Sequence, residues 1–96
     1  MSEPLQKLKK VVLFWVSMDY ESIESILQNV INDYDADVKP DELHKTLLEL
    51  RSMGLIESYA YSTHDQEYIP QVKVSNKPGK EIWWYITTRG KKIINE

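Results

Sequence analysis

The stretch PDELHKTLLELRSMGLI, residues 40–56, carries the clearest structural signal in this 96-residue chain. Its leucines recur at the three- and four-residue spacing of one helix face, at Leu43, Leu47 and Leu50. Pro40 suits the first turn of a helix because its missing N–H would have no partner there. Gly54 can adopt the left-handed conformation that ends a helix. The stretch therefore predicts a helix over residues 40–53, followed at once by a strand.

Two further segments with helical spacing precede this one, and they predict helices over residues 5–18 and 22–34. The second segment has a single apolar face. The first has an additional apolar stripe beside its main one, formed by Val11, Phe14 and Met18. This wide apolar arc has two interpretations. The helix is buried on two sides within its own domain, or the additional stripe contacts another protomer.

After Gly54 the pattern changes from helical spacing to alternation and turns. The predicted strands span residues 55–61, 71–75 and 81–86. Residues 62–68 are polar and predict a loop, and residues 76–80 carry a strong turn signal for a hairpin with a basic tip. A short helix is expected over residues 88–94. Together these elements predict one α+β domain over residues 1–96.

The composition excludes several classes of protein. With 42% hydrophobic and 28% charged residues, the chain resembles a globular domain. It contains no cysteine, which excludes a disulfide scaffold and a thiolate zinc site. The longest apolar run, Val11–Val16, is far shorter than the roughly 20 residues that span a bilayer. We therefore expect a cytoplasmic protein with no membrane partner.

The sequence contains no recognisable catalytic or metal-binding constellation. The spacing of Asp33-x-Asp35-x-Asp37 imitates the opening of a calcium loop. Val38, however, stands where that loop requires glycine, and His44 stands where it requires a bidentate glutamate. Serines and carboxylates are common, but no spacing among them indicates a nucleophile with its base. We expect no enzymatic activity, no metal and no cofactor.

Two stretches resemble the winged helix-turn-helix superfamily. Residues 41–56 look like its recognition-helix pattern, in which spaced leucines are followed by glycine, leucine and isoleucine. Residues 84–94, WYITTRGKKII, look like the aromatic-x-leucine-threonine-x2-glycine signature at the return strand of the wing in PadR-like and MarR-like regulators. The resemblance covers residues 5–94. It implies a three-helix core, an antiparallel β wing and a short C-terminal helix.

The resemblance also implies a homodimeric transcription regulator that binds double-stranded DNA. PadR-like proteins dimerise through a long C-terminal helix, and MarR-like proteins use extra helices at both ends. This sequence matches neither pattern. The remaining candidate for a dimer interface is the additional stripe of the first helix, at Val11, Phe14 and Met18.

In such a fold the third helix enters the major groove and the wing contacts phosphates. The candidate DNA-binding residues are Lys39, His44, Lys45 and Ser52 in or beside the third helix, and Lys73, Lys77 and Lys80 in the wing. Residues 62–96 carry a net charge of +2 and form the only positive third of the chain. Three carboxylates of the third helix would repel phosphates at a cost on the order of 1 kcal/mol each. They belong to Asp41, Glu42 and Glu49.

A second interpretation stays open, because the net charge of −3 and the pI near 5.4 differ from the basic pI of many DNA-binding domains. In this interpretation the domain is a protein–protein interaction module without specific DNA binding. Its docking surfaces would be the acidic third helix and the strand face that carries Trp83 and Tyr85. We expect Trp84 in the core, and Trp83 beside residues 62–68, with Tyr59 and Tyr61 nearby.

Overall fold

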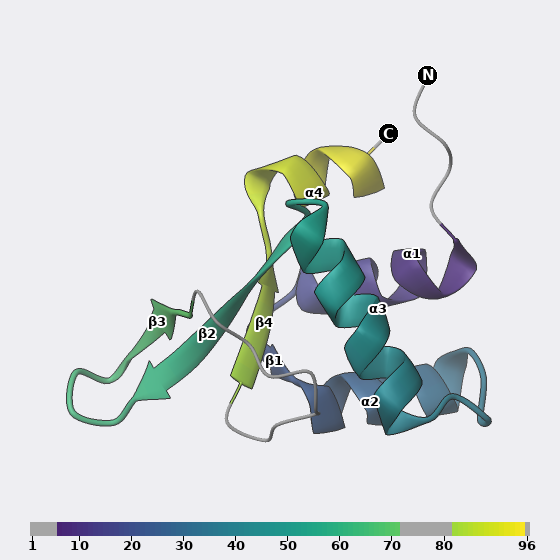
Figure 1. Cartoon of the computed structure of the whole chain (residues 1–96), viewed down its shortest axis with the longest axis horizontal. Coiled ribbons are helices and arrows are strands. Elements are labelled where there is room, and N and C mark those ends of the chain that lie inside the picture. Colours follow the sequence, from purple (N-terminus) through teal and green to yellow (C-terminus); the bar gives the residue numbers. More distant parts are fainter. Residues whose placement is uncertain (1–5, 72–81, 96) are drawn as a thin grey trace.

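A computed structural model of the chain describes residues 6–71 and 82–95. Within these ranges the elements follow the order α1 (Lys7–Val16), β1 (Glu21–Ser22), α2 (Ile23–Asp33), α3 (Pro40–Ser52), β2 (Ile56–Ser62), β3 (Glu67–Pro70), β4 (Ile82–Ile86) and α4 (Thr88–Ile94). The strands form one antiparallel sheet in the order β1-β4-β2-β3. The described residues therefore have an α+β fold, in which the β2–β3 hairpin extends away from the helices (Figure 1).

Strand pairing divides the sheet into an inner and an outer face, because successive side chains point to opposite sides. In the pairing of β2 with β4, Ser58 lies opposite Trp84 on the inner face, and Tyr59 lies opposite Trp83 on the outer face. The inner face joins the helices in a single hydrophobic core. Its buried members are Val12, Leu13, Val16, Ile23, Ile26, Val30, Val38, Leu43, Leu47, Leu50, Leu55, Ile56, Trp84 and Ile86.

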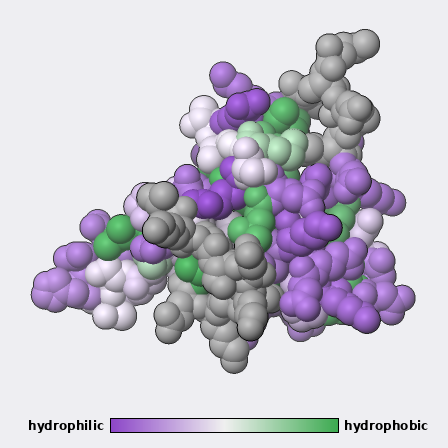
Figure 2. Space-filling view, viewed as in Figure 1, coloured by the Kyte–Doolittle hydropathy of each residue, from purple (hydrophilic) through white to green (hydrophobic). Residues whose placement is uncertain are grey.

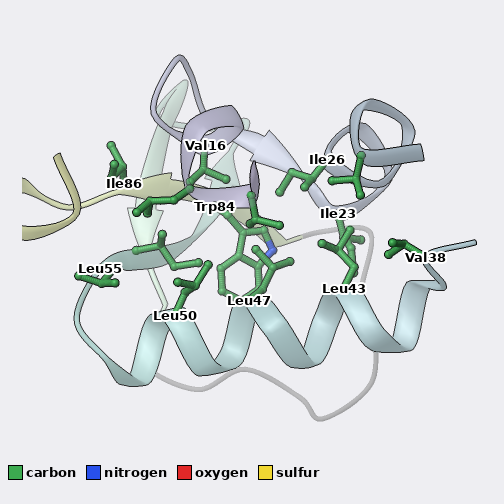
Figure 3. Packing of buried hydrophobic residues seen from close by; sticks show 14 residues of the cluster. Val16, Ile23, Ile26, Val38, Leu43, Leu47, Leu50, Leu55, Trp84 and Ile86 are labelled. Atoms are coloured by element: carbon green, nitrogen blue, oxygen red, sulfur yellow. The ribbon is translucent and has the colours of Figure 1, made fainter. Parts of the chain in front are cut away.

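Trp84 lies at the centre of this core and is only 1% exposed (Figure 3). Its indole lies above α3 beside Leu47, and Val16 of α1 lies on its other side. Both neighbours are completely buried. Because one side chain fills the space between the sheet and two helices, its truncation to alanine would cost about 3–5 kcal/mol. The inner face of the sheet thereby fixes where α3 lies.

Short polar contacts define the ends of the helices. Ser22 begins α2, since its Oγ accepts a hydrogen bond of 3.2 Å from the backbone N–H of Ser25. Thr87 begins α4 in the same way, with its Oγ1 accepting from the N–H of Gly90 at 3.1 Å. Pro40 takes the first turn of α3, where a missing N–H costs nothing.

The end of α3 is tied directly to the start of α4. Gly54 has a φ of 76°, which allows the chain to turn sharply out of α3 into β2. The Oγ1 of Thr87 donates a hydrogen bond of 2.7 Å to the carbonyl oxygen of Gly54. The N–H of Thr87 donates to the carbonyl oxygen of Leu55 at 3.0 Å. Thr87, directly after β4, is therefore bonded to the two residues directly before β2, so the start and the end of the strand segment are held together.

The expected and observed helices differ mainly at their ends. Within the described residues, the predicted helices are longer than α1, α2 and α3 by at most two residues at an end, and residue 5 lies outside the described residues. The short helix expected over residues 88–94 has the bounds of α4. Helix ends fray, and sequence patterns place them only within one or two residues. The sequence does not predict β1, because two residues are too few for a visible alternation.

The strands after α3 differ more from the expectation. The strand predicted over residues 55–61 is observed one residue later, as β2. The loop predicted over residues 62–68 is wrong at both ends, because Ser62 ends β2, and Glu67 and Tyr68 begin β3 and pair with β2. Of the strand predicted over residues 71–75, Gln71 lies outside any strand and the others lie outside the described residues. The strand predicted over residues 81–86 corresponds to β4, and residue 81 lies outside the described residues.

We expect Gly90→Ala to destabilise the protein by about 1–3 kcal/mol, because nothing near this position can move aside easily. A Cβ atom there would lie 2.3 Å from the backbone oxygen of Leu55 and 2.6 Å from Cγ1 of Ile86. Thermal unfolding followed by circular dichroism would show a lower Tm. Lys92→Ala, at an exposed position of the same helix, is the control and should change Tm little. An unchanged Tm for Gly90→Ala would contradict this close contact.

Candidate nucleic-acid interface

The outer face of α3 is the surface on which the sequence predicts DNA binding. Because Leu43, Leu47 and Leu50 are buried, the opposite side of the helix faces solvent. The exposed residues of α3 and of the position before it are Lys39, Pro40, Asp41, Glu42, Lys45 and Ser52. In the space-filling view, hydrophilic side chains cover most of the region over α2 and the N-terminal part of α3 (Figure 2).

His44 does not belong to this exposed face, contrary to the sequence-based expectation. It is only 3% exposed, and its ring lies edge-on to Trp84 with 6.4 Å between the ring centroids. The reason is its place on the helix, three residues before Leu47 and therefore on the flank of the buried stripe. On a helical wheel, residue 44 lies at the border between the buried and the exposed side of α3. The large side chain of Trp84 extends the core far enough to cover His44.

The charge of Glu49 is compensated by α1. The Nζ of Lys9 lies 2.9 Å from Oε2 of Glu49, and the lysine side chain is mostly buried at 16% exposure. This hydrogen bond lowers the pKa of Glu49, burial of the carboxylate opposes the shift, and the charges of Lys9 and Lys45 add to the lowering. Of the three carboxylates on α3, Glu49 is therefore held ionised beside two cations. The sequence gives no signal for this contact, because it joins two separate helices.

Ser52 and Lys45 offer different contacts to a ligand. The hydroxyl of Ser52 donates to the backbone oxygen of Glu49 at 2.7 Å, so its proton is engaged within the helix and its oxygen is left as an acceptor. Lys45 is exposed and one helical turn before Glu49. Lys39 immediately precedes the first turn of α3 and is also exposed. The exposed cations on this face of α3 are therefore the ammonium groups of Lys39 and Lys45.

Arg51 has a structural role that the sequence does not reveal. Its Nε lies 3.2 Å from Oε1 of Glu57 on β2, and its Nη2 donates to the backbone oxygen of Gln71 at 3.0 Å. The same oxygen accepts a hydrogen bond of 2.8 Å from Oγ of Ser58. Gln71, the last described residue before the predicted wing lysines, is thus fixed against α3 and β2. Those lysines, Lys73, Lys77 and Lys80, lie outside the described residues.

The outer face of the sheet carries a cluster of aromatic rings rather than a bare surface. Tyr20, from the connection between α1 and β1, stacks on Tyr68 with 3.9 Å between centroids and on Tyr85 with 4.7 Å. Tyr68 also meets Trp83 edge-on at 5.6 Å. We name this group the outer aromatic cluster. Its members are Tyr20, Tyr59, Tyr61, Tyr68, Trp83 and Tyr85.

This cluster reduces the surface that Trp83 and Tyr85 could offer to a partner. Both residues are half-buried, and Lys91 of α4 lies over the ring of Tyr85 at 5.6 Å. The expectation that residues 62–68 approach Trp83 is confirmed through Tyr68. The contribution of Tyr20 is not predictable from the sequence, because this residue precedes the sheet and lies far from β3 along the chain.

The additional apolar stripe of α1 is not covered by the described part of its own domain. Phe14 is 47% exposed and Met18 is 58% exposed, whereas Val11 is half-buried. The interpretation in which the domain itself buries both sides of α1 is therefore wrong for this part of the molecule. Such exposed apolar side chains, grouped on one side of a helix, are typical of an interaction surface.

Comparisons with known proteins do not identify a family: no family model matches the chain, and no curated protein matches it. Over the described residues, no group of three or more potential metal ligands comes together. In the same part of the chain, every helix is too short or too polar to cross a lipid bilayer.

We expect the outer aromatic cluster to make stability sensitive to alkaline pH. Burial, the largest cause, and nearby charges raise the pKa of Tyr59 and of Tyr68 above the ordinary value of 10.0. As the pH rises, the two phenols lose their protons at a lower pH in the unfolded chain than in the folded chain. Their contribution to the free energy of unfolding is therefore complete below about pH 10, and it is lost as the pH rises through their pKa values in the folded chain.

The measurement is urea unfolding at about pH 8 and about pH 11. Wild type should lose stability at the higher pH, and the double variant Tyr59→Phe/Tyr68→Phe should lose less of it. An equal loss in both proteins would show that these two phenols are not protected in the folded state.

Proposed function

We propose that the chain is a winged helix-turn-helix domain that binds duplex DNA as a cytoplasmic transcription regulator. The order of elements supports the fold, since three helices, α1, α2 and α3, precede the hairpin strands, and β4 lies between β1 and β2 in the sheet. In a winged helix, the third helix lies across the inner face of such a sheet and exposes its outer side to the groove. β3 is an additional strand at the edge beside β2.

The observation that carries the proposal is the direct passage from α3 into the hairpin strands. α3 ends before Gly54, β2 begins at Ile56, and Gln71 is held against Ser58 and Arg51. A rod-like helix with an exposed side is therefore joined rigidly to the start of the segment that carries Lys73, Lys77 and Lys80. In this proposal both parts contact one duplex.

The charges favour contacts to phosphate over the reading of bases. With His44 in the core, Lys39 and Lys45 are the cations on the exposed side of α3. Ser52 adds an acceptor. Phosphate contacts position a protein on DNA but carry little sequence information. Three to five such contacts would give a slope of roughly −3 to −5 in the logarithm of affinity against the logarithm of salt concentration.

The test is a titration of labelled mixed-sequence duplex at about 50 mM salt, followed by fluorescence anisotropy. We expect a Kd in the micromolar range that weakens as salt is added. Lys45→Gln should weaken binding a few-fold and reduce the salt slope by about 1, and Lys77→Glu should weaken it further. Glu49→Gln should tighten binding, because it removes a carboxylate near the phosphates and releases Lys9 from its ion pair.

Lys92→Gln is the matched control, because it removes one exposed cation from α4 without changing α3. An equal loss of affinity for Lys92→Gln and Lys45→Gln would indicate attraction by net charge alone. Identical binding by wild type, Lys45→Gln and Glu49→Gln would exclude α3 from the interface.

A second candidate function is a protein–protein interaction module without specific DNA binding. The burial of His44 favours it, because this removes a donor while Asp41 and Glu42 stay exposed in the first turn of α3. The other docking surface expected from the sequence, at Trp83 and Tyr85, is weakened by the outer aromatic cluster. The absence of duplex binding in the titration at low salt would select this second function, with a basic partner for α3.

A further inference from the structure

Three stacked tyrosine rings form a row across the outer face of the sheet. Tyr85 and Tyr68 belong to β4 and β3, which are separated by β2. Tyr20 stacks on both of them, with 4.7 Å and 3.9 Å between centroids, so its ring lies over β2. There it also meets the ring of Tyr59 edge-on at 5.0 Å. Contacts from three separate parts of the chain therefore hold this row together.

The end of the row at β4 is in contact with a cation of the protein itself. The Nζ of Lys91, from α4, lies over the ring of Tyr85 at 5.6 Å from its centroid. The face of an aromatic ring carries negative electrostatic potential, which attracts an ammonium or guanidinium group. One end of the row thus already holds a positively charged side chain.

The opposite end of the row, at β3, is open. Here Tyr68 meets Tyr61 of β2 edge-on at 5.0 Å, and Tyr61 is 43% exposed. The β2–β3 hairpin extends away from the helices, so the described helices leave this end uncovered (Figure 1). Among the described residues, no lysine or arginine lies over either ring.

A carboxylate lies close to this open end. Burial, the largest cause, raises the pKa of Tyr68, and the negative charge of Asp19 is the next cause. Asp19 is exposed, and its Oδ1 accepts a hydrogen bond of 2.7 Å from the backbone N–H of Tyr20. The ion pairs of the described residues do not include Asp19. An exposed ring and an unneutralised negative charge therefore lie at the same end of the row.

We propose that Tyr61, Tyr68 and Asp19 form a binding site for an arginine side chain in a basic segment of a partner protein. A guanidinium group is planar and stacks on an aromatic ring, and its N–H groups can donate to the carboxylate of Asp19. A lysine fits less well, because its ammonium group is more strongly hydrated. A nucleic acid is disfavoured, because Asp19 would repel its phosphates. The site belongs to the outer face of the sheet and does not depend on the proposed DNA binding.

The test uses three hexapeptides with blocked ends, GRGRGR, GKGKGK and GQGQGQ. Each is titrated into the ¹⁵N-labelled full chain and followed by two-dimensional NMR. We expect the arginine peptide to bind more tightly than the lysine peptide, and the glutamine peptide to leave the spectrum unchanged. The largest chemical-shift changes should fall on the amides of Asp19, Tyr61 and Tyr68.

The most specific variant is Asp19→Asn, because an asparagine keeps the acceptor for the N–H of Tyr20 and removes only the charge. Tyr61→Leu removes the exposed ring, and Tyr61→Phe keeps it. Asp19→Asn and Tyr61→Leu should each weaken binding of the arginine peptide about two- to fivefold, whereas Tyr61→Phe should bind like wild type. The control is Asp41→Asn, the same charge change at an exposed position of α3, which should alter the affinity little.

Three outcomes would overturn the inference. Equal losses of affinity for Asp19→Asn and Asp41→Asn would reduce the binding to attraction by net charge. Unchanged binding by Tyr61→Leu would place the contact away from the open end of the row. A response of Tyr61 and Tyr68 to single-stranded oligothymidylate, strengthened by Asp19→Asn, would assign the rings to nucleobases in place of arginine. None of these titrations contains duplex DNA, so their failure is distinguishable from a failure of the proposed function.

Discussion

The burial of Trp84 fixes how the sheet and the helices fit together. This side chain belongs to the inner face of β4, yet it fills the space above α3 and beside α1 (Figure 3). Because protein interiors are close-packed, a side chain of this size allows few alternative positions for the surrounding helices. It sets the inner side of α3 and thereby also its exposed side. The burial of His44 is a direct consequence, since its ring lies against the edge of the indole.

A second constraint acts where α3 ends. Gly54, Thr87 and Gly90 bring the start of β2, the end of β4 and the first turn of α4 within hydrogen-bonding or van der Waals distance of one another. On the far side of the sheet, Tyr20 stacks against rings from two strands and ties β3 to the helical part. The hairpin is therefore anchored at its base and along its outer face. These contacts hold the described end of the hairpin, at Gln71, in a defined position relative to α3.

The sequence predicts the α+β class and the core because these depend on local periodicity. Leucines at helical spacing, Pro40, Gly54 and the alternation around Trp84 are all visible in short windows. Features that depend on contacts between distant segments are not visible in this way. β3, the stacking of Tyr20 on Tyr68 and the ion pair between Lys9 and Glu49 are of this kind. Among the candidate DNA-binding residues that the structure describes, His44 lies on the wrong side of the core boundary, and Lys39, Lys45 and Ser52 are exposed as expected.

DNA binding through α3 and the hairpin can be tested by mapping which backbone amides of the full chain respond to duplex DNA in two-dimensional ¹H–¹⁵N NMR. We expect the largest chemical-shift changes on Lys39, Lys45, Ser52 and the segment between Gln71 and Ile82. Amides of the α1 stripe and of the outer aromatic cluster should change little. Changes confined to α1 or to the outer face of the sheet, or a spectrum that duplex leaves unchanged at low salt, would contradict it.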